Sequence, residues 1–420
     1  MLALFRKPFY GWWIVAGAVL SQFTWMAVGP TVVGVFLKPV VTDLGWQVWQ
    51  FTLGTSLAAA TGALSGIVAG EVVDRHGPRP LMLLGAAATT ICFVLLSVQS
   101  NLWIFLALYA ITGLAGWTLF GPLVVNAAVS KWFVARRGWA LALGSIGVSL
   151  AGMISPVTVT FVVDTWDWRV GYATLGVFVT LAIVPVAFVM RRTPEDYGMR
   201  PDGDGRDVVA QASMSQSGAE PPSLTRSQAL RTSGFWLLTA GFGLNFVAMT
   251  AILIHAIPFA TEAGFSRTVA SAALAVNGLG NLSSKAFWGC GLQRLDARLL
   301  TAVAYSISST GVALMIVAGT TGQSAILFTG FFLYGFGFGG TIPLSEFMWA
   351  HYFGRRHIGA IRGIGNPIAV VGTGVGPVLA GAWFDLSGTY DPAFIAAIAV
   401  YMAAAAVISI SRDPRRAAGP

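Results

Sequence analysis

Residues 70–79 read Gly70-Glu71-Val72-Val73-Asp74-Arg75-His76-Gly77-Pro78-Arg79, and the same outline returns 219 residues later as Gly289-Cys290-Gly291-Leu292-Gln293-Arg294-Leu295-Asp296-Ala297-Arg298. Each copy follows the second long apolar stretch of its half of the chain. A short loop of glycine, polar and arginine residues at the same point of two halves indicates an internal repeat. The sequence therefore predicts a duplicated bundle of membrane helices.

The composition leads to the same class of protein. Of the 420 residues, 55% are hydrophobic and 10% are charged, and the mean hydropathy is +0.72. A soluble chain of this length is less apolar. A spanning helix needs roughly 20 mostly apolar residues, and stretches of this kind recur along the whole chain. They lie at residues 10–37, 47–73, 79–98, 101–130, 138–163, 168–190, 234–261, 267–292, 298–319, 322–350, 359–384 and 391–411.

These stretches predict an all-α membrane protein with twelve transmembrane helices in two pseudo-symmetric six-helix bundles. The domains are expected at 1–192 and 234–420, joined by a mobile polar linker at 193–233. Further residues repeat at offsets of 219 to 221, which supports the duplication. The clearest pairs are Pro122 with Pro343, Gly144 with Gly365, and Asp164 with Asp385.

The basic residues are distributed unevenly between the two sides of the predicted helices. Twenty of the 25 Lys and Arg residues fall on the side of both termini, and only Lys38, Arg169 and Arg267 fall on the other. This asymmetry predicts a protein of the plasma (cell inner) membrane with both termini in the cytoplasm. The net charge of +8 is spread over short loops, so we expect contact with membrane lipid and no nucleic-acid partner. Residue 6 begins a basic segment before a first helix that is too long for a cleavable signal.

Three motifs together resemble a known family. They are Gly70-x-x-x-Asp74-Arg75-x-Gly77-x-Arg79, Tyr10-Gly11-Trp12-Trp13, and Lys131-Trp132-Phe133-x-x-Arg136-Arg137-Gly138-x-Ala140-x-Ala142-x-Gly144. With twelve helices and a central linker, the chain resembles the major facilitator superfamily, and within it the monocarboxylate transporter and oxalate/formate antiporter group. The resemblance implies a secondary transporter whose two halves rock around a central site, with small organic acid anions as cargo.

The repeated loop is expected to act in gating. Asp74 is able to bind a helix N-terminus or an arginine when the halves close on its side, and Arg75 and Arg79 would take part in that closure. The alternative is that the two arginines serve only as topology signals. Gln293 stands at the position of Asp74 in the second copy, so closure by charge would depend mainly on the first half.

Lys285 is the one deep lysine of the predicted helices, and ionisable groups inside a membrane are usually functional. It lies four residues before Gly289, where the monocarboxylate group carries an arginine that engages the substrate carboxylate; the resemblance assigns that role to Lys285. Asn281, one turn away, stands where proton-coupled relatives have an aspartate, and Thr31 stands where some carry a lysine. Symport with a proton is therefore less favoured than exchange for a counter-anion or facilitated movement of the anion. The alternative for Lys285 is snorkelling to the interface.

Three further residues are expected to line the substrate site. His255 could hydrogen-bond a substrate or relay a proton, although a histidine satisfied by neighbouring carbonyls is equally compatible with the sequence. Trp117 and Tyr334, near mid-helix, would shape a pocket for a small carbon skeleton. Their alternative is ordinary packing.

Glu346 is the carboxylate inside the helices of the second half, and Arg362 is its expected partner. The pair is predicted to be a structural clamp between neighbouring helices, with an inner gate as the alternative.

Nothing in the sequence predicts an enzyme, a cofactor or a metal site. No phosphate-binding loop of the Gly-x-x-x-x-Gly-Lys-Ser/Thr type is present, and Cys92 and Cys290 lie in apolar helices of different halves without metal-ligand spacing. We expect a monomer. The alternatives to anion transport are a membrane sensor or receptor on a transporter scaffold, and an efflux transporter for another small molecule.

Overall fold

A computed structural model describes residues 9–133, 136–202, 224–292, 294–354 and 358–414. The side chains of a few helix residues, Asp74 among them, are not described. The first half comprises α1 (Gly11–Val28), α2 (Pro30–Leu44), α3 (Val48–His76), α4 (Arg79–Val98), α5 (Leu102–Ile111), η1 (Thr112–Gly116), η2 (Trp117–Phe120), α6 (Pro122–Trp132), α7 (Arg137–Gly144), α8 (Ile146–Thr165) and α9 (Trp168–Val189).

The segment after α9 contains η3 (Glu195–Tyr197) and α11 (Arg226–Leu230). The second half comprises α12 (Ser233–Glu262), α13 (Arg267–Gly291), α14 (Ala297–Thr321), α15 (Ser324–Phe338), α16 (Thr341–Phe353), α17 (Ile358–Ser387) and α18 (Asp391–Ile410). Over the described residues these helices form twelve membrane-length stretches, which agrees with the predicted fold class.

Four of the expected helices are broken, and small or cyclic residues explain most of the breaks. Gly29 and Pro30 separate α1 from α2, and this combined stretch continues to Leu44, beyond the expected end at residue 37. A π-helical and a 3₁₀ segment separate α5 from α6, which starts at Pro122. Ser145 separates α7 from α8, and two glycines separate α15 from α16.

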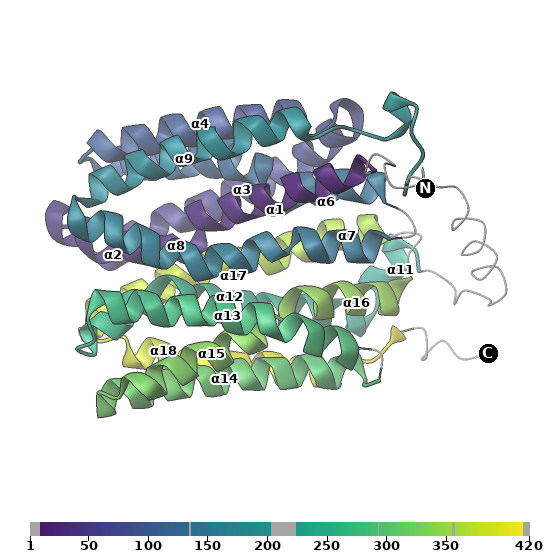
Figure 1. Cartoon of the computed structure of the whole chain (residues 1–420). Coiled ribbons are helices and arrows are strands. Elements are labelled where there is room, and N and C mark those ends of the chain that lie inside the picture. The colour runs from purple at the N-terminus through teal and green to yellow at the C-terminus, as the bar shows by residue number, and fades with distance from the viewer. Residues whose placement is uncertain (1–8, 134–135, 203–223, 293, 355–357, 415–420) are drawn as a thin grey trace, which may run out of the picture.

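The helices of the two halves form two adjoining groups, coloured purple to blue and teal to yellow in Figure 1. Helices α4 and α9 pack together in the first group, as do α14, α15 and α18 in the second, while α3 contacts α17, α8 contacts α13 and α2 contacts α12 across the groups. The start of α1 and the end of α18 lie at the same end of the bundle (Figure 1). We call this the termini end, and the other the opposite end.

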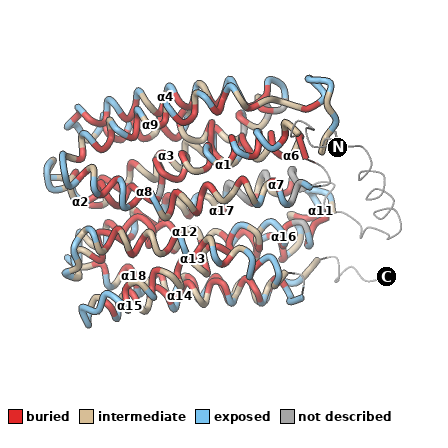
Figure 2. Tube along the Cα trace, viewed as in Figure 1, coloured by how far each residue is buried: buried red, intermediate tan, exposed pale blue. Residues whose placement is uncertain are grey.

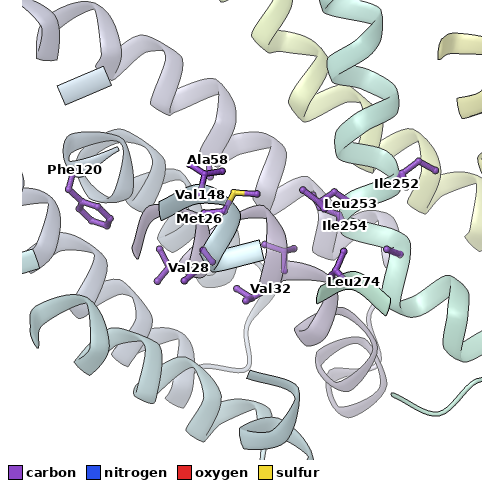
Figure 3. Close-up of a cluster of buried hydrophobic side chains, with 14 of the residues drawn as sticks. Met26, Val28, Val32, Ala58, Phe120, Val148, Ile252, Leu253, Ile254 and Leu274 are labelled. Carbon is purple, nitrogen blue, oxygen red and sulfur yellow. The ribbon is translucent and has the colours of Figure 1, made fainter. Parts of the chain in front are cut away.

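Apolar side chains join the halves toward the opposite end. Figure 2 shows buried residues on the inward faces of the helices and exposed residues on the outer ones. Val32 and Met26 of the first half and Ile254 and Leu274 of the second belong to one continuous buried cluster, which Figure 3 shows. Burial of this surface disfavours the entry of water between the halves there.

Ten stretches of the described chain are both long and apolar enough to cross a membrane, and α3 and α13 are not among them. Each is the second helix of its half, and each contacts the other half. Helix α13 carries Asn277, Asn281 and Lys285. Polar residues are tolerated at this depth because they face protein or a water-filled space rather than lipid.

The ends of the expected mobile linker are docked. The Asp202 amide donates to the Trp132 carbonyl (3.1 Å) at the end of α6, and the Leu224 amide donates to the Phe353 carbonyl (3.0 Å) at the end of α16. The two attachment points are equivalent in the duplication, because Lys131-Trp132-Phe133 corresponds to His351-Tyr352-Phe353 at an offset of 220 residues. Residues 203–223 lie outside the described part of the chain.

Candidate functional site between the two halves

At the opposite end, an ion pair connects the halves. Arg267 begins α13, and its guanidinium lies 2.5 Å from the Asp164 carboxylate at the end of α8. The same guanidinium donates a hydrogen bond of 2.6 Å to the Val35 carbonyl of α2. Because the two acceptors belong to different helices of the first half, Arg267 holds three helices together.

A carboxylate makes the second polar connection at this end. Asp385, near the end of α17, accepts hydrogen bonds from the amides of Val48 (3.0 Å) and Trp49 (2.8 Å) in the first turn of α3. These amides have no acceptor within their own helix, and the helix dipole favours a negative charge beside them. Asp385 therefore caps a helix of the other half.

Close packing of α8 against α13 extends the contact toward the middle of the bundle. A Cβ on Gly278 would lie 2.5 Å from the backbone nitrogen of Met153, so the two backbones touch. Further along, the Ser149 hydroxyl donates to the Asn281 side-chain oxygen at 2.8 Å, and both residues are buried. Within the described residues of α8 and α13, no hydrogen bond between the two helices lies closer to the termini end than this one.

Lys285 lies one helical turn beyond Asn281, on the same face of α13 that meets the first half. Its side chain is half-buried, and its ammonium has no hydrogen-bond or ion-pair partner among the residues that the structure describes. An uncompensated charge at such depth is unfavourable unless water or an anion accompanies it. Asn281 and Lys285 are thus brought together just past the seal between the halves.

The sequence analysis did not single out Gln22 and Asn126, two polar residues of the first half that bind each other. Gln22 of α1 donates from Nε2 to the Oδ1 of Asn126 in α6 (3.2 Å) and is almost fully buried. A Cβ on Gly144, beside the break between α7 and α8, would lie 3.3 Å from Gln22 Nε2. The sequence signal was a neutral polar residue within an apolar stretch, which is weaker than the signal of an ionisable one. Ser149 was missed for the same reason.

His255 lies in a different part of the protein. It is fully buried within the second half, where its Nε2 is 3.0 Å from the Pro377 carbonyl and its ring packs on Tyr390 at 5.1 Å. His255 lies about 7 residues from the opposite end of the bundle, where α12 ends, and Lys285 lies about 18 residues from it, where α13 begins. At a rise of about 1.5 Å per residue, the two residues are about 17 Å apart along the bundle. The structure therefore does not bring His255 to Lys285.

The two aromatic candidates are also embedded within single halves. The Tyr334 hydroxyl donates to the Met249 carbonyl at 2.8 Å, and its side chain is 1% exposed. Trp117 is half-buried in η2, with its ring edge-to-face on Tyr109 at 6.4 Å. The hydrogen bond of Tyr334 and the ring contact of Trp117 both stay within one half, so packing accounts for what is observed of the two residues.

Glu346 of α16 and Arg362 of α17 form a two-point ion pair within the second half. The Arg362 side chain is 25% exposed and that of Glu346 is 50% exposed. The pair joins two helices of the same half, which is the arrangement expected of a clamp.

The first copy of the repeated loop packs against the end of α9 in its own half. Arg75 is exposed and its carbonyl accepts from Arg192 at 2.7 Å, while the Arg79 guanidinium lies 4.2 Å from the centre of the Phe188 ring of α9. The side chain of Asp74, and Gln293 altogether, lie outside the described residues. The gating role of this loop stays a prediction.

A polytopic helical protein with paired halves, sealed at one end and holding a charged residue between them, has the architecture of a secondary transporter. The family model of the Major Facilitator Superfamily matches residues 14–370. The chain belongs to that superfamily, as the resemblance implied.

Individual relatives are distant. The membrane sensor protein UhpC of Salmonella typhimurium is 27% identical over 66% of this chain and 64% of its own length. The oxalate:formate antiporter of Oxalobacter formigenes is 22% identical over 82% of this chain and 79% of its own. Monocarboxylate transporter 2 of Homo sapiens is 22% identical over 94% and 84%.

A solved structure confirms the fold. The crystal structure of a D-xylose-proton symporter superposes with a TM-score of 0.72 over 97% of this chain and 98% of that one, at 13% sequence identity. At this identity the likeness concerns the fold alone.

Proposed function

We propose that this transporter moves small organic acid anions, monocarboxylates or dicarboxylates, and that Lys285 is the counter-charge of the substrate carboxylate. The observation that carries the proposal is the position of Lys285: it faces the first half just past the inter-half seal and lacks a partner among the described residues. An ammonium in this setting attracts an anion and repels a cation. Efflux of a cationic compound is therefore disfavoured.

The same position favours exchange over net uptake. When the transporter changes its orientation empty, the Lys285 ammonium must pass between the halves without a counter-charge, whereas a bound anion would neutralise it. Asn281 offers no carboxylate to take that place, and its side-chain oxygen already accepts from Ser149. A loaded transporter should thus reorient faster than an empty one.

The seal at the opposite end serves as the gate in this proposal. Arg267–Asp164 and the Asp385 cap would break when the halves rock, and closure at the termini end would follow. The uneven distribution of arginines supports a cytoplasmic termini end, so the site would open to the cytoplasm in the conformation described. The domain boundaries at 192 and 233 are part of the same proposal.

The test is counterflow in proteoliposomes with radiolabelled formate, lactate and oxalate, with and without unlabelled anion inside. We expect the trans anion to stimulate uptake by wild-type protein, Lys285→Ala to abolish uptake, and Lys285→Arg to retain part of it. Lys131→Ala is the matched lysine control, since Lys131 lies at the termini end of α6. Uptake by Lys285→Ala at the wild-type rate would refute the site.

A membrane sensor is the second candidate function, because one relative carries that name. A sensor binds its ligand without moving it. Anion-dependent thermal stabilisation of the wild type together with absent counterflow would favour the sensor and refute transport.

A further inference from the structure

A cavity of about 420 Å³ lies at the termini end of the first half, away from the site between the halves. The loop after α3, the start of α4 and the residues that follow α9 form its walls. Four arginines dominate its lining: Arg75, Arg79, Arg191 and Arg192. Asp196 is the carboxylate among the lining residues that the structure describes. The cavity therefore carries an excess of positive charge.

Asp196 is already engaged by one of these arginines. Arg192 Nε lies 3.1 Å from one Asp196 carboxylate oxygen and its Nη2 lies 3.3 Å from the other. Its remaining Nη1 donates to the Arg75 carbonyl at 2.7 Å. Arg192 and Asp196 thus neutralise each other and fix the wall of the cavity.

Two further guanidinium groups of the lining, those of Arg79 and Arg191, are held by aromatic faces. Arg191 lies between the rings of Tyr10 (4.2 Å) and Tyr197 (4.0 Å), and Arg79 lies over Phe188 (4.2 Å). Cation–π contacts use the flat face of a guanidinium and leave the N–H groups at its edge available. Neither Arg79 nor Arg191 donates a side-chain hydrogen bond to a described residue. Such pre-oriented forks match the oxygens of a phosphate group.

An apolar outer surface adjoins the cavity. Phe188, at the end of α9, is 55% exposed. Leu84 of α4 is 54% exposed and Leu181 of α9 is 70% exposed. Helices α4 and α9 pack side by side (Figure 1), so their exposed faces present a continuous surface to lipid chains. A ligand that fits both parts carries a phosphate at one end and acyl chains at the other.

We propose that this cavity binds the headgroup of an anionic phospholipid, with Arg79 and Arg191 holding the phosphate and the acyl chains lying along α4 and α9. A zwitterionic lipid brings an ammonium into the arginine cluster and is disfavoured. Inorganic phosphate supplies the same oxygens without the chains, so it should bind far more weakly.

The test measures lipid retention by native mass spectrometry of the full chain from nanodiscs of mixed phosphatidylglycerol and phosphatidylcholine. We expect the wild type to retain phosphatidylglycerol selectively and Arg79→Gln/Arg191→Gln to lose it roughly 30-fold, at about fivefold per arginine. Arg226→Gln/Arg231→Gln removes two exposed arginines of the linker, just before α12, and should retain the lipid. Arg79→Gln alone, at an exposed position, serves if the double variant does not fold.

Three results would overturn the proposal. Equal retention of phosphatidylglycerol by the wild type and by the Arg79 and Arg191 variants would exclude these arginines as the site. Equal loss in the Arg226/Arg231 control would show nonspecific attraction to charge. Displacement of the lipid by inorganic phosphate at equimolar concentration would identify a free-anion site instead.

Discussion

Asp164 and Asp385 occupy equivalent positions in the two halves, and each binds the first turn of the second helix of the other half. Asp164 ends α8 and pairs with Arg267 at the start of α13, whereas Asp385 lies near the end of α17 and accepts from the amides that start α3. The duplication therefore produced two symmetry-related connections with different chemistry. One is an ion pair and the other is a helix cap.

The cap predicts a shift in conformation when its charge is removed. Asp385→Asn should weaken the connection by about 1 kcal/mol, the usual value of a cap together with the helix dipole. Conformations open at the opposite end should then increase about fivefold. Spin labels at Thr42 and Thr321, both exposed at that end, would report a larger population at long distance. Asp391→Asn is the control, and an unchanged distance distribution in Asp385→Asn would contradict the prediction.

Loss of the Arg267–Asp164 ion pair should increase the population open at the opposite end more than loss of the Asp385 cap. Arg267→Gln loses both Asp164 and the Val35 carbonyl, and the partly exposed pair with its charged hydrogen bond should contribute about 1–2 kcal/mol. The charge swap Arg267→Asp/Asp164→Arg should recover part of the loss. Arg169→Gln serves as control because Arg169 pairs with Asp43 inside the first half. If Arg267→Gln and Arg169→Gln shift the distance between the labels at Thr42 and Thr321 equally, the Arg267 contact is not the connection between the halves.

Gly278 should be intolerant of any side chain. A Cβ there would lie 2.5 Å from Met153 N and 2.6 Å from Gly152 C, so Gly278→Ala must push α8 and α13 apart. Overpacking costs about 1–3 kcal/mol, and we expect counterflow to fall roughly tenfold or more. At Gly289, on the same helix, a Cβ has no neighbour within 4 Å. Gly289→Ala should therefore keep normal activity; equal activities of the two variants would contradict the close contact.

A substitution in the Glu346–Arg362 pair distinguishes a structural clamp from a gate. Glu346→Gln removes the negative charge that pairs with the two terminal nitrogens of the half-buried Arg362 guanidinium. We expect the unfolding midpoint in detergent to fall by an amount equivalent to about 1–2 kcal/mol. Because both residues belong to the second half, the distance between labels at Thr42 and Thr321 should not change. A shifted distance distribution with an unaltered midpoint would identify a gate.

The helix content and the pairing of the halves were predictable because they depend on local quantities. Apolar stretches of sufficient length must form helices in lipid, and the repeated loop marked the same point in both halves. The prediction also placed Lys285 and Asn281 on one face, since positions four residues apart are neighbours in any helix. The expected partner of Glu346 followed from adjacent helices joined by a short loop.

The breaks at Gly29 and Ser145 and the docking of the linker ends depend on packing between distant segments, and the sequence signals for them are weak. His255 and Tyr334 illustrate the same limit. Both are polar groups in apolar helices, yet their partners are carbonyls of neighbouring helices in the same half, which no spacing along one helix reveals.

The sequence by itself determined a duplicated membrane protein of twelve helices with one deep lysine, because hydrophobic length and charge distribution fix which segments lie in lipid. Only the tertiary structure decided which polar groups meet. The sealed end, the helix cap by Asp385 and the arginine cavity each join residues far apart in the chain, and the packing of α13 leaves Lys285 without a partner in the described part of the chain. Contacts of this kind depend on how helices rotate and cross, and helix periodicity leaves that rotation open.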